Sequence, residues 1–344
     1  MSSTVSVNGY TDVDTDVDTD VDVDVDVQRV GIVGCGLMGS GIAEVCAQAG
    51  RDVVVVETTR TAAAAGLERI TRSLARAVAS GKLTGAQRDA AVGRIVVTAD
   101  MARMADRDLV VEAVAEDERA KLEVFARLDD VVERADAVLA TNTSSIPVIR
   151  LAAAVSRPRQ VIGLHFFNPV PVLPLVELVP SLLTGDETVR RTHAFATGVL
   201  DKEVVRAQDR AGFVVNALLV PYLLAAVRMA ESGMASAQDI DRGMTLGCAH
   251  PLGPLALADL IGLDTVQAIA RSMYEEYREP LYAPPPLLAR MVDAGLLGRK
   301  TGRGFHGYGG SGDGGAMRED GAVVAGAAGP ARPVHGRRHG EQPR

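Results

Sequence analysis

Short apolar runs separated by segments of helical periodicity dominate the first half of the chain. Val30, Ile32 and Val33 form one such run, which ends in a group of glycines, and residues 53–56 form the next. Between the two runs, apolar positions recur at helical spacing until Gly50, where we expect the helix to end. Short, fully apolar runs joined by helices are typical of buried strands in a parallel sheet. This segment therefore predicts a β-α-β unit.

The same alternation continues to the middle of the chain and then changes. We predict helices over residues 61–80 and 118–130, and strands at Ile95–Thr98, Leu109–Glu112, Val138–Thr141 and Val161–Phe166. After Arg210, long apolar helical segments follow at 213–231 and 254–276, with no further clear strand. The chain is therefore predicted to be an α/β protein. A Rossmann-type, doubly wound parallel sheet over residues 29–208 is followed by an all-α domain over residues 209–308.

The two ends of the chain lack such periodicity. Residues 1–28 alternate Val with Asp, and a strand of this pattern would place a column of like charges on one face. We predict a disordered acidic leader, and metal binding by it is disfavoured because it has no turn-forming residues among its carboxylates. Residues 309–344 are rich in Gly, Pro, Arg and Ala, and we predict a disordered tail there.

The net charge changes little in this picture. The formal charge of −8 equals the contribution of eight aspartates between Asp12 and Asp26, so the remainder of the chain is close to neutral. A neutral body gives no electrostatic reason to expect nucleic acid or an anionic membrane surface as a partner. No apolar stretch reaches the roughly 18 residues of a membrane span. The leader also lacks the basic region and apolar core of a secretion signal.

Cys35, Cys46 and Cys248 are too few and too widely spaced for a disulfide framework or a metal site. We therefore predict reduced thiols, a cytoplasmic location and no bound metal.

Candidate chemistry begins at the glycines after the first strand. In the sequence GCGLMGSG, Gly34, Gly36 and Gly39 form a G-x-G-x-x-G turn that encloses Leu37 and Met38. The first glycine permits the tight turn, the second lets the backbone approach a pyrophosphate, and the third lets helix and strand pack closely. Because the turn lies between a strand and a helix, this otherwise weak motif predicts a dinucleotide site.

The identity of the dinucleotide depends on the end of the second strand. Glu57 lies 18 residues after Gly39, where a carboxylate can accept hydrogen bonds from the adenine ribose. The same carboxylate repels a 2′-phosphate, which favours NAD. Arg60 follows three residues later and is able to receive that phosphate, so NADP remains the alternative.

A histidine near a later strand end is the candidate for proton transfer. Oxidation of an alcohol needs a base for the hydroxyl proton, and a neutral imidazole suits that task. His165 is the candidate base, and Glu177, twelve residues later, is the candidate carboxylate that fixes its tautomer. A histidine between Leu164 and Phe166 is, on its own, more often a buried core residue than a catalytic one.

Four segments resemble the 3-hydroxyacyl-CoA dehydrogenase family, and its 3-hydroxybutyryl-CoA branch in particular. They read, in chain order, ATNTSSIP, GLHFFNPVPVLPLVEL, GFVVNALLVPYL and LGRKTGRGF. The resemblance extends from about residue 29 to residue 308. It implies an acyl-CoA substrate and a homodimer formed through the helical domain, although the same apolar helices would serve a core within one chain.

The resemblance also implies roles for particular residues. His165 would be the general base or acid, Glu177 its partner, and Ser144 and Asn216 the groups that bind the substrate oxygen atoms. The cofactor side would include Glu116, Lys121, Asn142, Ser144, Asn168 and Lys300, and the substrate side Ser73, Ser144, Asn168 and Asn216.

The chain departs from the family pattern at several positions. Many relatives carry Pro-Gly-Phe, Asn-Arg and Phe-Tyr, where this chain has Ala211 before Gly-Phe, Ala217 after Asn216, and His306 after Phe305. Ser80 also replaces a basic residue often found on the coenzyme A side, with Lys82 nearby. These changes affect the expected acyl pocket and nucleotide affinity, and they leave the candidate catalytic residues in place.

The expected activity is therefore reversible, NAD(P)-dependent oxidation of a short-chain (S)-3-hydroxyacyl-CoA. One alternative is a dehydrogenase of the same fold that acts on a free hydroxy acid or on an alcohol carried by an acyl carrier protein. The other is a dinucleotide-binding protein without turnover.

Overall fold

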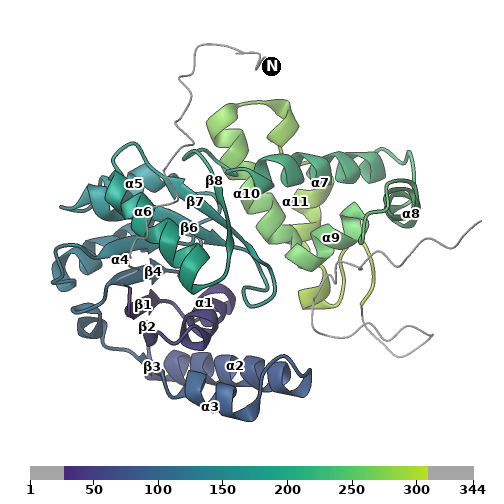
Figure 1. Ribbon diagram of the computed structural model, residues 1–344. Coiled ribbons are helices and arrows are strands. Elements are labelled where there is room, and N and C mark those ends of the chain that lie inside the picture. Colours follow the sequence, from purple (N-terminus) through teal and green to yellow (C-terminus); the bar gives the residue numbers. More distant parts are fainter. Residues whose placement is uncertain (1–26, 309–344) are drawn as a thin grey trace, which may run out of the picture.

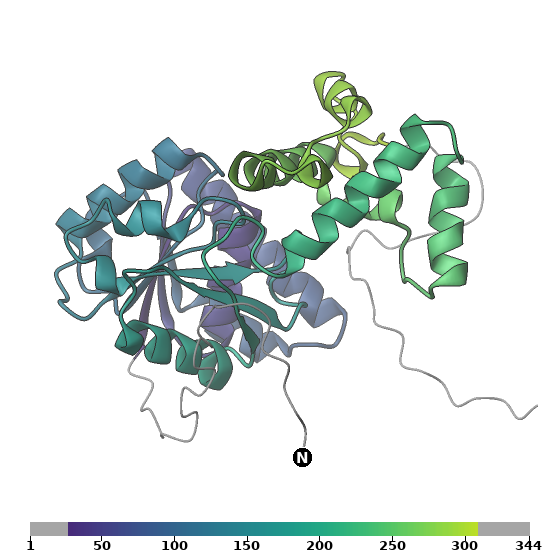
Figure 2. The same cartoon turned by 90° about the horizontal axis from the view of Figure 1, so that it is seen from above.

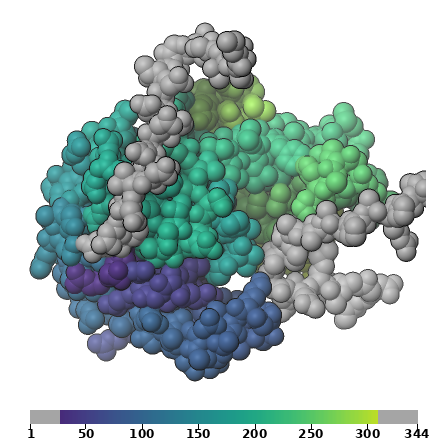
Figure 3. Space-filling view, in the orientation of Figure 1, coloured from purple at the N-terminus to yellow at the C-terminus, as the bar shows by residue number. Residues whose placement is uncertain are grey.

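The computed structural model describes residues 27–308, which form a sheet domain followed by a helical domain (Figure 1). In the space-filling view the two domains lie side by side, the sheet domain in purple to teal and the helical domain in green to yellow (Figure 3). The predictions for the acidic leader before residue 27 and for the tail after residue 308 lie outside the described residues.

The sheet has eight strands in the order β3-β2-β1-β4-β5-β6-β7-β8. The first six pair in parallel, β6 pairs antiparallel with β7, and β7 pairs in parallel with β8. The order reverses beside β1, as in a Rossmann fold, and ligands of such sheets bind at the carboxyl ends of the strands at this point. The strands are β1 (Arg29–Val33), β2 (Asp52–Val56), β3 (Ile95–Thr98), β4 (Leu109–Glu112), β5 (Val138–Thr141), β6 (Val161–Phe166), β7 (Leu175–Pro180) and β8 (Glu203–Arg206).

Both faces of the sheet are covered by helices. Side chains of a strand alternate between the faces, so Val53 and Val55 of β2 belong to one apolar core and Val54 and Val56 to the other. The first core is closed by α1 (Leu37–Gln48), α2 (Arg60–Ala79), α3 (Gly85–Val92) and α6 (Asp186–Ala194). The second is closed by α4 (Glu118–Val131) and α5 (Val148–Ala152). Burial on both faces explains why these strands read as continuous apolar runs.

Among the strands and α-helices of the sheet domain, five were not predicted: the strands β7 and β8 and the helices α3, α5 and α6. The strands β7 and β8 lie at the antiparallel edge of the sheet, and prolines on both sides of β7 conceal its periodicity. The helix α3 is short, and it begins with a capping box between Thr84 and Gln87. The remaining strands of the sheet lie where the apolar runs predicted them.

The helical domain contains α7 (Val215–Glu231), α8 (Ala237–Gly247), α9 (Pro254–Ile261), α10 (Leu263–Tyr277) and α11 (Pro286–Asp293). Seen from above, α7 leads away from the sheet domain toward the other helices (Figure 2). The single helix predicted over residues 254–276 is two helices, because Gly262 has a φ of 102° and separates α9 from α10. The apolar faces of α7, α9, α10 and α11 form one core.

Two buried aspartates hold the last described segment against this domain. Asp259 accepts hydrogen bonds from the backbone N–H groups of Phe305 (3.0 Å) and His306 (2.9 Å). Asp241 accepts from the N–H groups of Leu255 and Ala256 in the first turn of α9, and His306 Nε2 lies 2.7 Å from its Oδ2. The histidine that replaces the expected tyrosine is therefore part of a polar anchor of the domain.

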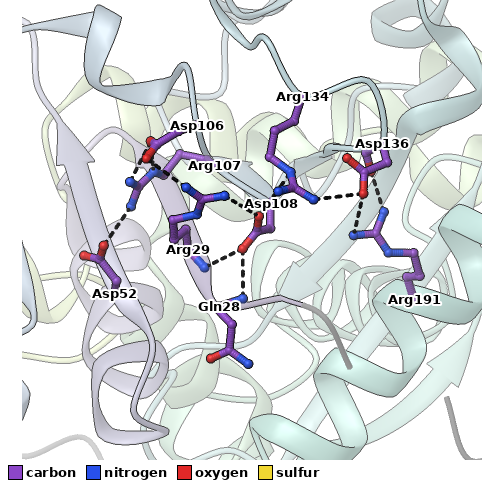
Figure 4. Close-up of polar contacts among 9 residues, drawn as sticks. All are labelled: Gln28, Arg29, Asp52, Asp106, Arg107, Asp108, Arg134, Asp136 and Arg191. Carbon is purple, nitrogen blue, oxygen red and sulfur yellow. Dashed lines mark hydrogen bonds and ion pairs between the residues drawn. The ribbon is translucent and has the colours of Figure 1, made fainter. Parts of the chain in front are cut away.

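A network of arginines and aspartates lies at the amino ends of the parallel strands (Figure 4). At its centre Asp108, only 3% exposed, accepts hydrogen bonds from the backbone N–H groups of Gln28 (2.9 Å) and Arg29 (2.7 Å). Its second oxygen lies 3.2 Å from Arg134 Nε and 3.5 Å from Arg29 Nη2. Arg107 joins Asp106 to Asp52 in the same network. These contacts fix the start of β1 against β4.

Replacing Asp108 with Asn is expected to lower the free energy of unfolding by about 2–4 kcal/mol, because the buried acceptor of two amides and two guanidinium groups loses its charge. Urea unfolding measures the change. Asp106→Asn is the matched control, since Asp106 is 55% exposed and its ion pairs should contribute less than about 1 kcal/mol. Equal stability of the two variants would contradict the role assigned to Asp108.

Candidate active site

The glycine turn lies between β1 and the N-terminus of α1. Gly34 has a φ of 94°, which favours glycine, and a Cβ there would lie 2.7 Å from the carbonyl oxygen of Ala113. A Cβ at Gly39 would lie 1.9 Å from the carbonyl oxygen of Gly34. The first turn of α1 has no side-chain cap and no acidic residue, and Gly36 and Leu37 are exposed. A free helix N-terminus beside a close-packed glycine turn fits a pyrophosphate.

The carboxylate of Glu57 is held against this turn. Its Oε1 accepts the N–H of Cys35 at 2.5 Å, and its Oε2 accepts the N–H of Thr58 at 3.0 Å. Arg69 of α2 donates to the carbonyl oxygen of Cys35 at 2.5 Å and fixes the turn from the other side. Arg60 lines a cavity of about 530 Å³ between α2 and the end of β3. The carboxylate of Glu57 is thus fixed at the end of β2, three residues before the guanidinium of Arg60.

His165 and Glu177 form a buried pair. They face each other in the antiparallel register of β6 and β7, and His165 Nδ1 lies 2.8 Å from Glu177 Oε2. His165 is 6% exposed and Glu177 is completely buried. The imidazole also packs against Phe167, with ring centroids 4.6 Å apart, and Phe213, at 5.6 Å. With Nδ1 directed at the carboxylate, Nε2 is the ring nitrogen left for another partner.

The second oxygen of Glu177 reaches the helical domain. Oε1 accepts the N–H groups of Val214 (3.0 Å) and Val215 (2.8 Å) at the start of α7. A carboxylate at a helix N-terminus is favoured by the helix dipole. Asn216, 8% exposed, is the next residue of α7. One carboxylate thus connects the histidine of β6 to the helix that carries Asn216.

The loop after β5 is held by Glu116. Its Oε1 accepts from Thr143 Oγ1 (2.5 Å), from the N–H of Ser144 (2.9 Å) and from the N–H and Oγ of Ser145 (3.1 and 2.9 Å). Its other oxygen lies 3.2 Å from Nζ of Lys121, which is 1% exposed. Burial alone would raise the pKa of Glu116, but Lys121 and these hydrogen bonds hold it below its ordinary value. Ser144 therefore occupies a defined position.

Two asparagines flank the end of β6. Asn142 follows β5 and its Oδ1 accepts the N–H of Phe166 at 2.9 Å, so it fixes the strand one residue beyond His165. Asn168 is exposed and lies just after Phe167, which contacts the imidazole. Both asparagines thus lie on the carboxyl side of the sheet near the histidine.

Two further expected residues have partners outside this group in the structure. Lys300 forms an ion pair with Asp264 at the start of α10, with Nζ 2.5 Å from Oδ1. Ser73 is half-buried on α2 and hydrogen-bonds the carboxyl group of Glu44 on α1. Burial raises the pKa of Glu44 above its ordinary value.

Glu112, the last residue of β4, was not among the site residues predicted from the sequence. It is completely buried and accepts a hydrogen bond from Lys121 Nζ at 2.7 Å. Two features of the sequence could have indicated Glu112. It is an acid at the end of an otherwise apolar strand, and a lysine, Lys121, follows nine positions later.

Within residues 27–308, no helix is long and apolar enough to cross a membrane. In the same part of the chain, no three or more histidines, cysteines or acids are placed to hold a metal ion.

The sheet order, the glycine turn at β1 and the polar residues gathered at the carboxyl ends of β4, β5 and β6 define a Rossmann-type dinucleotide-binding protein.

Comparisons with known proteins identify the family. The NAD binding domain of 3-hydroxyacyl-CoA dehydrogenase matches residues 29–210, and the C-terminal domain of the same family matches residues 212–308. The 3-hydroxybutyryl-CoA dehydrogenase of Mycobacterium tuberculosis (strain ATCC 25618 / H37Rv) is 58% identical over 282 residues, which cover 82% of this chain and 99% of that protein. The chain therefore belongs to the 3-hydroxyacyl-CoA dehydrogenase family, and it is an oxidoreductase with a nicotinamide cofactor.

Solved structures agree with this assignment. The crystal structure of M. tuberculosis FadB2 matches with a TM-score of 0.82 and 58% identity, covering 82% of this chain and 99% of that one. The (S)-3-hydroxybutyryl-CoA dehydrogenase PaaH1 from Ralstonia eutropha matches with a TM-score of 0.78 and 43% identity, covering 83% and 100%.

Proposed function

We propose that the enzyme reversibly oxidises short-chain (S)-3-hydroxyacyl-CoA, with 3-hydroxybutyryl-CoA as the preferred substrate, to the 3-oxoacyl-CoA. The observation that carries this proposal is the buried pair of His165 and Glu177 at the carboxyl edge of a dinucleotide-binding sheet. The names of the relatives that are 58% and 43% identical support the substrate class.

Each residue of the candidate site has a separate role in the proposed reaction. In the direction of oxidation, Nε2 of His165 accepts the proton of the substrate hydroxyl, because Nδ1 donates to Glu177. The carboxylate of Glu177 then stabilises the imidazolium and holds the ring orientation. Ser144 and Asn216 bind the substrate oxygen atoms and align the hydroxyl with the base. NAD bound at the glycine turn would supply the hydride acceptor for the carbon atom that carries this hydroxyl.

The residues present fit NAD. Gly34, Gly36 and Gly39 would bring backbone close to the pyrophosphate, with Leu37 and Met38 in the same turn. Glu57 would accept hydrogen bonds from the ribose in exchange for the amide contacts that it makes in this structure. Further contacts on the cofactor side would come from Glu116, Lys121, Asn142, Ser144, Asn168 and Lys300. Since Arg60 lies beside Glu57, NADP is the alternative to test.

On the substrate side, we propose that Ser73 contacts the coenzyme A moiety and that Asn168 lies near the acyl end. The three candidate substrates differ at this position. A free hydroxy acid is too short to contact Ser73 on α2, and a substrate on a carrier protein would place the surface of that protein there instead of a nucleotide.

The decisive experiment follows the absorbance of NADH, and separately of NADPH, with acetoacetyl-CoA and with free acetoacetate. We expect rapid oxidation of NADH that requires the thioester, and slower oxidation of NADPH. Turnover of acetoacetate without turnover of the thioester would favour the free-acid alternative. Turnover of neither compound, despite NADH binding, would leave the acyl-carrier-protein substrate as the candidate.

We also propose that the enzyme is a cytoplasmic homodimer formed through the helical domain. Leu218 of α7 and Leu246 of α8 are each 75% exposed, as is Met234 between the two helices. Apolar side chains with this exposure suit an interface between identical copies. Sedimentation velocity is expected to give twice the mass of one chain, and a monomer at micromolar concentration would overturn this proposal.

A further inference from the structure

A single buried carboxylate connects the loops that surround the candidate active site. Glu112 accepts at Oε1 from Lys121 Nζ (2.7 Å) and from the N–H of Val114 (2.7 Å), and at Oε2 from Thr141 Oγ1 (2.7 Å). These donors belong to three elements: helix α4, the loop after β4, and the end of β5. Glu112 is 0% exposed and Lys121 is 1% exposed, so water does not compete for these contacts.

Two routes lead from Glu112 to Ser144. In the first, Lys121 bridges Glu112 to Glu116, which accepts the N–H of Ser144 at 2.9 Å. In the second, Thr141 donates to Glu112 and accepts the N–H of Thr143 at 3.2 Å. Both routes converge on residues 143–145. The position of this segment therefore depends on one carboxylate at the end of the neighbouring strand.

Glu112 also helps to fix the backbone that packs against the glycine turn. The N–H of Ala113, the next residue, donates to the carbonyl oxygen of Val33 at 2.8 Å, immediately before the turn. The carbonyl oxygen of Ala113 faces Gly34 so closely that a Cβ there would clash with it. The contact of Glu112 with the N–H of Val114 thus fixes the backbone against which the turn packs.

We propose that Glu112 is a positioning residue for the reaction, which aligns Ser144 with His165 through Lys121, Glu116 and Thr141. The proposal rests on the function proposed above. It assigns to Glu112 no contact with substrate, cofactor or reacting atoms. A buried ion pair contributes little net stability compared with apolar residues of similar volume, so a role in folding alone does not account for its contacts to a helix, a loop and a strand end.

Glu112→Gln tests the proposal directly. Glutamine keeps the shape, but its amide group cannot accept from one of the three donors and leaves Lys121 without this carboxylate. We expect kcat to fall roughly 10- to 100-fold, as for a misplacement of catalytic groups. The Kd for NADH measures separately how far the glycine turn and the cofactor side are displaced. We also expect faster amide hydrogen exchange at residues 143–145. This readout requires no substrate, so it separates failure of the positioning proposal from failure of the proposed function.

One further variant separates positioning from folding. Thr141→Val removes one hydroxyl and leaves the ion pair of Glu112 and Lys121 intact, and we expect kcat to fall about tenfold. Thermal unfolding of Thr141→Val, with a Tm close to that of the parent, shows that the loss of kcat does not come from a loss of folding.

Parental kcat in Thr141→Val would overturn the proposal. Unchanged exchange at residues 143–145 in Glu112→Gln would overturn it as well. If the parent bound NADH but did not turn over acetoacetyl-CoA, the proposed function would fail, and the exchange data would still decide whether Glu112 holds this segment.

Discussion

Replacing His165 with Ala is expected to lower kcat by roughly 10²- to 10⁴-fold, because a positioned general base typically contributes a factor of this size. The Kd for NADH should change little, since the imidazole contacts Glu177, Phe167 and Phe213 and is separate from the glycine turn. Stopped-flow absorbance with acetoacetyl-CoA measures turnover, and NADH fluorescence measures binding.

His193→Ala is the control for His165→Ala. His193 is a partly buried histidine of α6, outside the candidate site, and its loss should leave kcat unchanged. Thermal unfolding of both variants shows whether the fold is retained. A His165→Ala enzyme that keeps most of the parental kcat would exclude this residue as the base.

The second large effect is expected for Glu177→Gln. Glutamine can still accept the N–H groups of Val214 and Val215 through its oxygen, which leaves its amide group facing His165 Nδ1. That amide group donates, so the imidazole would carry its proton on Nε2 and be unable to act as the base. We expect kcat to fall roughly 10³- to 10⁴-fold, the size of effect that an inverted tautomer produces in another His-carboxylate pair.

Glu276→Gln is the matched control for this variant. Glu276 also holds the segment just before α7, through the N–H of Ala211 (2.9 Å) and Arg210 Nε (2.6 Å), but no contact joins it to His165. If the two variants lost kcat equally, the effect of Glu177 would lie in the position of the start of α7 rather than in the histidine tautomer.

The sequence predicted the elements whose apolar pattern is complete. Strands β1, β2, β4, β5 and β6 are buried on both faces, so their runs were clear, and the edge strand β3 was recognised from its run of apolar residues although only Ile95 is buried. By contrast, β7 is flanked by prolines and carries Glu177 at its centre, and its pairing with β6 is a long-range contact that no local pattern reveals. The break at Gly262 was hidden for a related reason, because apolar residues continue at helical spacing on both sides of it.

The candidate site was only partly accessible from sequence. The resemblance brought in Glu116 and Lys121 as residues of the cofactor side, but it gave no indication that Lys121 is buried between two carboxylates. Burial depends on how α4 packs on the sheet, which spacing within α4 does not report. For the same reason Glu112 was missed, since its importance comes from partners 2, 9 and 29 positions away.

The network around Asp108 lies at the amino ends of the parallel strands, and the pair of His165 and Glu177 lies toward the carboxyl end of β6. Catalytic residues often limit how far an enzyme can be stabilised, because changes close to them reduce turnover. Here the length of the strands separates the ion-pair network that stabilises the sheet from the proposed catalytic pair. Engineering for heat tolerance can therefore add ion pairs around Arg29 and Arg107, at the amino ends of the strands, without changing the surroundings of His165 and Glu177.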